Sequence, residues 1–208
     1  MRQIILFLLA VFTFVFTACS SEKDEAQKIE NQELKLNSSL SETDFKKICK
    51  SFERIVNTRS CLNNEDSCKL ALQPLINDGK LIQRQILVQA EFNTYFTKED
   101  LQFFENLSEE QLATLSFSIH ELNQVIFAER LDTTEMSDSI TQMQSVNINK
   151  IRDCLSFAFG ITVVKQLSVK GIITATTLRQ ALIAVGKRYL GYVGVVLMIA
   201  DFYDCFYG

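Results

Sequence analysis

The stretch that decides the fold is SEEQLATLSFSIHELNQVI, residues 108–126. Its large apolar residues recur three or four positions apart, which predicts an amphipathic helix with one face turned to a core. That face consists of Leu112, Leu115, Ile119, Leu122, Val125 and Ile126. Ser108 can cap the helix, because Gln111 stands three residues later and can return a hydrogen bond. We expect this helix to end near Glu129 or Arg130.

Other segments carry the same helical signals. Ser41 precedes Asp44 by three residues, and Thr97 precedes Asp100 by three, so each hydroxyl predicts a helix start. After Ser41 an apolar stripe follows at helical spacing: Phe45, Ile48, Cys49, Phe52, Ile55 and Val56. Two further helices are expected, over about 67–77 with an interruption at Pro74 and over about 81–92. One proline and no tryptophan in 208 residues disfavour a sandwich or barrel, so the chain is predicted to be mostly α.

Charge and glycine divide the chain in two. Residues 147–208 hold seven basic and three acidic residues and six of the seven glycines, whereas residues 19–146 carry a net charge of −9. The division predicts an acidic helical bundle over residues 41–130 and a small, hydrophobic, cationic helical module over residues 147–208. Helices are expected over about 147–166, 176–189 and 191–203. Residues 131–146 are rich in Thr, Ser, Asp and Gln and predict a polar linker.

The first eighteen residues predict an export signal. Arg2 supplies a positive start, residues 4–16 are almost wholly apolar, and Ala18 is a small residue directly before Cys19. The apolar run is too short to span a bilayer. Residues 19–40 are polar and lack a periodic apolar face, which predicts a flexible tether.

Cysteine usage agrees with export, because disulfides form outside the reducing cytoplasm. Cys61 and Cys68 flank a short polar stretch and are one candidate pair. Cys154 and Cys205 bracket the cationic module and are the second. Cys49 lies on an apolar helix face and is expected to be a buried free thiol, with a 49–61 or 49–68 bridge as the alternative.

The sequence offers no specific catalytic motif. His120 is the single histidine, so a multi-histidine metal site is excluded. Its place on an amphipathic helix favours a solvated or cap-satisfied imidazole over a catalytic one. The cysteines lack CxxC spacing, the glycines lack the order of a phosphate-binding loop, and the basic residues alternate with aliphatic ones. We therefore expect no enzyme activity, no cofactor, no metal and no nucleic-acid partner.

The junction at Ala18-Cys19 resembles the lipobox of bacterial lipoproteins, and the polar run over residues 20–25 resembles the acidic tether of Bacteroidota surface lipoproteins. The resemblance implies a lipid on Cys19 and a place on the outer membrane or cell surface, with an ordinary signal peptide as the alternative. Asp132-Thr133-Thr134 and Asp138-Ser139-Ile140 resemble the O-glycan acceptor pattern of exported Bacteroidota proteins, which makes Thr133 and Ser139 glycosylation candidates. The alternative is a solvated loop in which these residues serve as caps.

The overall plan of the chain resembles secreted lipoprotein bacteriocins of the Bacteroidota, whose precursor is processed into two peptides. This implies an antibacterial protein that an Arg-specific protease cuts at Arg130 and that acts on a target-cell membrane or surface receptor. Basic and apolar groups of the module are candidates for membrane contact: Lys165, Lys170, Lys187, Arg188, Tyr192, Val196 and Met198. The alternatives are a core built from the same residues and a surface binding or immunity lipoprotein that damages no membrane.

Overall fold

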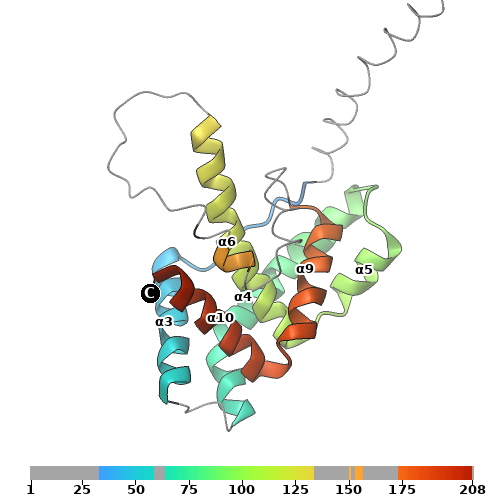
Figure 1. Ribbon diagram of the computed structural model, residues 1–208. Helices are drawn as coiled ribbons and strands as arrows, with labels where there is room; N and C mark the ends of the chain where they lie inside the picture. The colour runs from blue at the N-terminus through green and yellow to red at the C-terminus, as the bar shows by residue number, and fades with distance from the viewer. Residues whose placement is uncertain (1–32, 59–63, 134–149, 151–152, 157–172, 208) are drawn as a thin grey trace, which may run out of the picture.

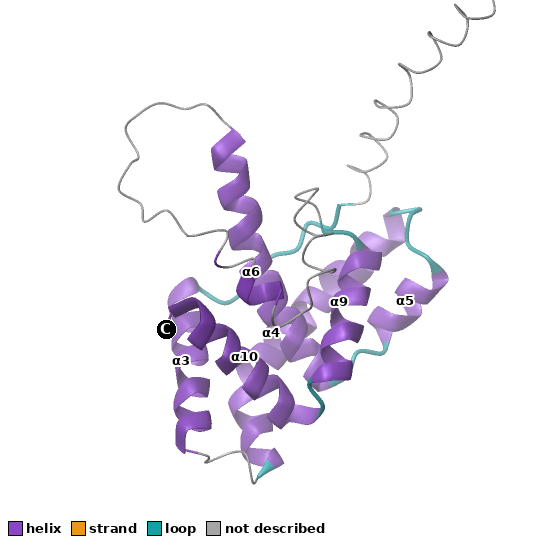
Figure 2. Ribbon diagram, in the orientation of Figure 1, coloured by secondary structure: helices purple, strands orange, loops and turns teal. Residues whose placement is uncertain are grey.

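The computed structural model describes residues 33–58, 64–133, 150, 153–156 and 173–207 of the chain (Figure 1). All regular secondary structure in these ranges is α-helical, as Figure 2 shows, which confirms the mostly-α prediction. The helices are α3 (Glu42–Thr58), α4 (Glu65–Phe92), α5 (Lys98–Glu105), α6 (Glu109–Thr133), α9 (Ala175–Arg188) and α10 (Gly191–Tyr207).

Three helices begin where their hydroxyl caps predict. The Asp44 main-chain N–H donates to Ser41 Oγ at 3.1 Å in the first turn of α3, and the Gln111 N–H donates to Ser108 Oγ at 3.3 Å in the first turn of α6. Thr97 and Asp100 form a reciprocal capping box at the start of α5. Each cap satisfies main-chain N–H groups that have no partner inside the helix.

Helix α4 runs unbroken through Pro74, so the predicted interruption and the separate helix from residue 81 are wrong. A proline in a helix interior removes one main-chain hydrogen bond and crowds the preceding turn. Here Leu72, Leu75 and Ile76 are fully buried around it. Burial of large side chains on both sides of Pro74 therefore outweighs the local cost.

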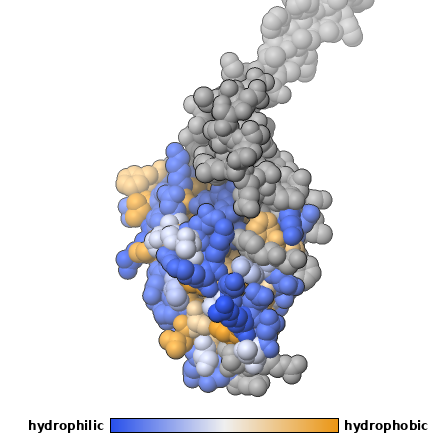
Figure 3. Space-filling view, turned by 90° about the vertical axis from the view of Figure 1, so that its left-hand side faces the viewer, coloured by the Kyte–Doolittle hydropathy of each residue, from blue (hydrophilic) through white to orange (hydrophobic). Residues whose placement is uncertain are grey.

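The described hydrophobic residues form one core, which extends in sequence from Leu34 to Phe202. Helix α10 packs against α3, α4 and α6, while α9 packs against α5 and α6. Phe117 of α6 lies edge-to-face on Phe202 of α10, with ring centroids 5.1 Å apart, and also stacks on Phe45 of α3 at 5.8 Å. The boundary that charge predicts between two modules is therefore not a boundary of the hydrophobic core in the described residues. The face in Figure 3 is largely hydrophilic, with separate hydrophobic patches.

Residues 33–40 differ from the predicted flexible tether. Leu34 and Leu36 are buried in the common core, and the Leu34 N–H donates to the Ile173 carbonyl at 2.7 Å. The two leucines alternate with polar residues, so an extended chain can bury one side while the other faces water. The tether prediction therefore extends too far toward the C-terminus; residues 19–32 and the predicted signal, 1–18, lie outside the described residues.

The later helix limits differ modestly from expectation. Helix α6 continues to Thr133 instead of ending near Glu129, so the first three residues of the predicted polar linker are helical. Helices α9 and α10 fall close to their predicted ranges, although α10 extends to Tyr207. Of the helix expected over 147–166, residues 150 and 153–156 are helical, and the others lie outside the described residues.

Candidate functional site

The candidate site is the set of contacts that hold α9 and α10 against the other helices. No single helix in the described ranges has both the length and the hydropathy to cross a membrane, whereas α9 and α10 reach both as a pair bent by 107°. Core helices of proteins in water can meet the same criteria. Gly191 sits at the bend with φ of +67°, a conformation that favours glycine.

The first contact joins the start of α10 to α4 and α6. The Tyr192 hydroxyl donates to Glu109 Oε2 at 2.7 Å, and Lys69 Nζ lies 2.6 Å from the same oxygen. The hydrogen bonds from Lys69 and Tyr192 lower the pKa of Glu109, and the bond to Glu109 raises the pKa of Tyr192. Lys69 Nζ also lies 5.5 Å from the centroid of the Tyr192 ring. Because this cluster is open to solvent, it orients α10 more than it stabilises it.

The second contact joins α9 to α5 through a buried charge. Arg179 Nε lies 2.8 Å from Asp100 Oδ1, as an ion pair without the alignment of a hydrogen bond. Arg179 also donates from Nη1 to Glu99 Oε2 at 3.1 Å, and the Thr176 hydroxyl donates to Asp100 Oδ2 at 3.1 Å. Asp100 is fully buried, so loss of Arg179 would leave an uncompensated charge in the core.

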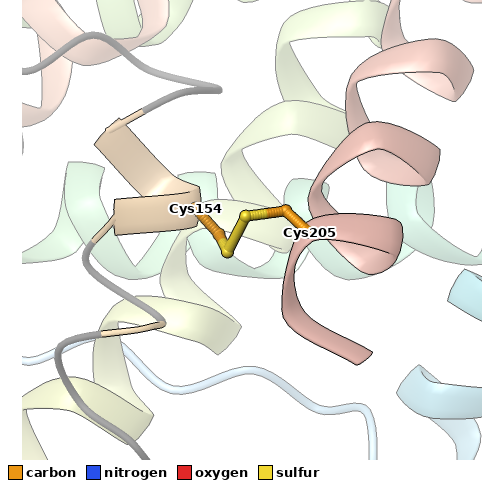
Figure 4. The surroundings of a disulfide bond; sticks show 2 residues. All are labelled: Cys154 and Cys205. Atoms are coloured by element: carbon orange, nitrogen blue, oxygen red, sulfur yellow. A yellow bond between two sulfur atoms is a disulfide. The ribbon is translucent and has the colours of Figure 1, made fainter. Parts of the chain in front are cut away.

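The third contact is the disulfide between Cys154 and Cys205, with an S–S distance of 2.03 Å (Figure 4). It ties the end of α10 to the helical residues 153–156. The second cysteine pair that the sequence predicts is therefore bonded in the structure. Cys68 is buried and also disulfide-bonded; its predicted partner, Cys61, lies outside the described residues. Cys49 is a buried free thiol, as expected, and the alternative 49–61 and 49–68 bridges are absent.

The predicted membrane-contact residues occupy two different environments. Val196 and Met198 are fully buried in the core, and Tyr192 is partly buried against Glu109. Lys187 and Arg188 are exposed next to the α9–α10 bend. Val196 and Met198 therefore fit the alternative prediction, in which these residues build a protein core. Lys165 and Lys170 lie outside the described residues.

The predicted processing and modification residues are described only in part. The main chain of Arg130 lies within α6, and Thr133 is the last residue of that helix. An intact helical backbone does not fit the extended cleft of a protease, so the main chain at Arg130 has to unwind before cleavage there. Cys19 and Ser139 lie outside the described residues.

Sequence reasoning missed a buried polar centre around Asp78 of α4. Its carboxylate accepts hydrogen bonds from the Ser39 N–H and hydroxyl, each at 2.6 Å, from the Ser38 hydroxyl at 2.9 Å and from the Ser116 hydroxyl at 2.7 Å. The group thereby joins the N-terminal segment, α4 and α6. No sequence signal marks it, because an aspartate within a helix ordinarily indicates a solvated face.

A second buried polar group lies between α3 and α6. The His120 ring stacks on Phe45 with centroids 3.6 Å apart, and burial lowers its pKa. Burial also raises the pKa of Glu121 to about 8 and raises the pKa of the Cys49 thiol, to which the nearby Glu121 adds. A nucleophilic cysteine needs a lowered pKa, so this arrangement does not activate Cys49.

Neither the described residues nor known proteins supply a further assignment. Within the described ranges, no group of three His, Cys, Asp or Glu residues is placed to hold a metal ion. No protein-family model, curated protein or solved structure matches the chain.

Proposed function

We propose that the protein is an exported, lipid-anchored antibacterial protein of the bacteriocin type, whose C-terminal helices act on a competitor's membrane after they leave the bundle. One observation carries this proposal. Helix α10 is the most apolar of the described helices, and α3, α4 and α6 cover it in the intact chain. Only together with α9 does it have the length and hydropathy of a bent span.

In this proposal the N-terminal helices keep the C-terminal helices in a stored form. Acidic groups of the first part hold groups of the second: Asp100 and Glu99 pair with Arg179, and Glu109 accepts from Tyr192. A buried apolar helix can enter a bilayer only after the contacts that bury it are broken, because the same apolar surface cannot be covered by protein and by lipid at once.

Release follows from cleavage at Arg130 by an Arg-specific protease. Because Arg130 is helical, the last turns of α6 must unwind before a protease can bind there, and helix ends open at low cost. The Cys154–Cys205 bond lies wholly on the C-terminal side of the cut. The released peptide would therefore keep this bond, while its polar contacts to Glu109 and Asp100 would have to break.

The first experiment spots purified protein on lawns of related Gram-negative bacteria, before and after limited Arg-specific proteolysis, and records fragment masses. Killing should track cleavage at Arg130. Arg130→Lys keeps the charge and helix propensity but removes the protease site, so the treated variant should not kill. Undiminished killing by the uncut variant would remove proteolysis from the proposal, and absence of killing from every form would contradict the proposal itself.

A vesicle experiment tests the membrane step directly. Leu190 at the α9–α10 bend is 78% exposed, so Leu190→Asp should leave the fold intact. After cleavage, the wild-type protein should release dye from vesicles that contain phosphatidylglycerol, and Leu190→Asp should reduce the release. Equal release by both would exclude the bend as the entry point.

The lipid anchor and surface location have their own test. Growth with a labelled fatty acid should label the wild-type protein but not Cys19→Ser, and protease added to whole cells should reach the wild-type protein. An unlabelled wild-type protein would exclude the lipoprotein assignment while leaving the killing experiments valid.

The second candidate is a surface-anchored binding or immunity lipoprotein that damages no membrane. Complete burial of Val196, Met198 and Ile199 in the common core favours it, because extraction of α10 would expose all three. A sensitive strain that expresses the intact chain should then survive the cognate toxin. If the toxin still kills the strain that expresses the intact chain, the immunity role is wrong.

A further inference from the structure

An exposed apolar stripe follows one face of the second half of α4. Phe92 is 83% exposed, Val88 56% and Leu81 42%, and these positions lie on one side of the helix together with exposed Arg84. We refer to Leu81, Arg84, Val88 and Phe92 as the α4 stripe. Large apolar side chains that gather on one face, with Tyr95 just beyond the helix end, indicate a contact surface more than scattered exposure does.

Residues 35–37 lie beside this stripe. Gln85 and Gln89 flank the stripe on α4. Gln85 makes two hydrogen bonds to the main chain of Asn37, and Gln89 makes two to the main chain of Lys35. The segment therefore enters the fold near the C-terminal end of α4, as Figure 1 also shows. The described chain therefore begins close to the last turns of α4, the part of the helix that carries Val88 and Phe92.

The length of chain before this point limits its distance from a lipid anchor. Fourteen residues, 19–32, separate Cys19 from residue 33. A chain of this length spans at most about 50 Å. With Cys19 acylated, the α4 stripe is held within reach of the bilayer at all times, which raises its effective concentration at the surface.

We propose that the α4 stripe docks on the membrane that carries the protein's own lipid anchor; this rests on the acylation of Cys19 in the proposed function. Phe92, Val88 and Tyr95 enter the boundary between headgroups and acyl chains, and Arg84 pairs with anionic headgroups. Glu91 lies at one edge of the stripe and stays in water. An anchor together with a shallow apolar contact holds a protein in one orientation, which an anchor alone does not.

The proposed contact gives the bent α9–α10 pair a direction. The bend lies at the other end of α4, where the Glu65 carboxylate adjoins Gly191 and Lys69 adjoins Tyr192. Helix α4 has 28 residues and is therefore about 40 Å long. With Phe92 against the protein's own membrane, the bend points outward from the cell.

The absence of tryptophan from the chain allows a site-specific test. Phe92→Trp places one fluorophore on the stripe, and Leu70→Trp places one on a 74% exposed position at the opposite end of α4. The acylated full chain is reconstituted in vesicles of phosphatidylethanolamine and phosphatidylglycerol, with or without brominated acyl chains. We expect emission from Phe92→Trp to shift to shorter wavelength and to be quenched by bromine, and emission from Leu70→Trp to change little. Equal behaviour of the two variants would overturn the proposal.

A second measurement separates this proposal from the lipid anchor. Unacylated Cys19→Ser protein is floated with the same vesicles, and Phe92→Asp should reduce the bound fraction roughly tenfold, whereas Leu70→Asp should not. The mass of the N-terminal peptide of the native protein reports acylation independently. If Phe92→Asp leaves flotation unchanged and instead converts a dimer to a monomer, the stripe is an interface between copies and the proposal is wrong.

Discussion

Gln89 holds the main chain of Lys35 at both hydrogen-bonding groups: its Oε1 accepts from the Lys35 N–H, and its Nε2 donates to the Lys35 carbonyl, each at 2.9 Å. Gln85 repeats the arrangement with Asn37. Four residues of a helix rise about 6 Å, and two residues of extended chain rise nearly 7 Å, so the two spacings match. The glutamines thus act toward residues 35–37 as a neighbouring strand would.

Removal of both carboxamides should loosen this segment. For Gln85→Ala with Gln89→Ala, we expect faster hydrogen exchange at the amides of Lys35 and Asn37 and a loss of about 1–2 kcal/mol in unfolding free energy. Gln73→Ala is the control, because Gln73 bonds only within α4, to Asn77. Unchanged protection at Lys35 and Asn37 in the double variant would contradict the pairing.

Two glycines should respond in opposite ways to alanine. A Cβ at Gly79 would overlap the Leu112 carbonyl oxygen of α6, so Gly79→Ala should force α4 and α6 apart and lower stability by about 2 kcal/mol or more. A Cβ at Gly186 meets nothing within 4 Å, so Gly186→Ala in α9 should raise stability by about 0.5–1 kcal/mol. Urea titration of both variants checks the pair; equal effects would show that the close approach is absent.

The buried Glu121 should make the protein less stable as pH rises. Its pKa is about 8 in the folded protein and 4.5 when unperturbed, so between these values the folded state binds the extra proton. Stability attributable to this group is therefore full below about pH 4.5 and falls toward pH 8, by at most about 1.4 kcal/mol per pH unit. Glu121→Gln should flatten this slope and exceed the wild type in stability at pH 8.

The lowered pKa of His120 changes stability with pH in the opposite direction. At acid pH the unfolded state binds a proton at His120 more readily than the folded state does, so the protein becomes more stable as pH rises toward 6.5. Glu121→Gln keeps His120, and the variant should retain this acid-side rise. Identical pH profiles for the wild type and Glu121→Gln would exclude Glu121 as the source of the alkaline loss.

The Cys154–Cys205 bond closes a loop with a sequence separation of 51. Chain-entropy arguments give a bond of this kind about 2–4 kcal/mol, chiefly through the unfolded state. Cys154→Ala with Cys205→Ala should therefore lower the urea midpoint, and use of a variant instead of a reductant leaves the disulfide of Cys68 intact. An unchanged midpoint would show that the core alone holds the end of α10.

Loss of Arg179 should lower the stability of the fold more than loss of an exposed cation does. Arg179→Met leaves the fully buried Asp100 without its ionic partner and should cost about 3–5 kcal/mol. Lys47→Met is the control, because Lys47 pairs with Asp44 on the exposed surface of α3, and its loss should change stability little. Thermal unfolding of the two variants measures the difference, and similar melting temperatures would contradict a buried charge at Asp100.

Local signals in the sequence predicted much of the helical fold. Ser41, Thr97 and Ser108 mark helix starts because a cap depends only on residues within one turn. Pro74 misled for the converse reason: its cost is local, but the burial that outweighs it comes from α6 and α10, which are distant in sequence. The predicted tether over residues 33–40 differs from the structure for the same reason, because the residues that bury Leu34 and Leu36 are distant in sequence.

The contacts of the candidate site were beyond sequence reasoning. An aspartate in a helix ordinarily lies on the solvated face, and only the tertiary arrangement brings Ser116 to Asp78 and Arg179 to Asp100. The apolar character of α10 was evident from its composition. Its coverage by α3, α4 and α6 was not, because composition does not distinguish a core helix from one that enters a membrane.

The bond between the Leu34 N–H and the Ile173 carbonyl also sets an order of events in time. It joins residues 139 positions apart, and the core around it includes α10, the last of the described helices. A chain that emerges from a ribosome N-terminus first cannot complete this core until α10 has also emerged. Until then the apolar faces of α3, α4 and α6 that α10 covers stay exposed, and exposed apolar surface favours aggregation of the nascent chain.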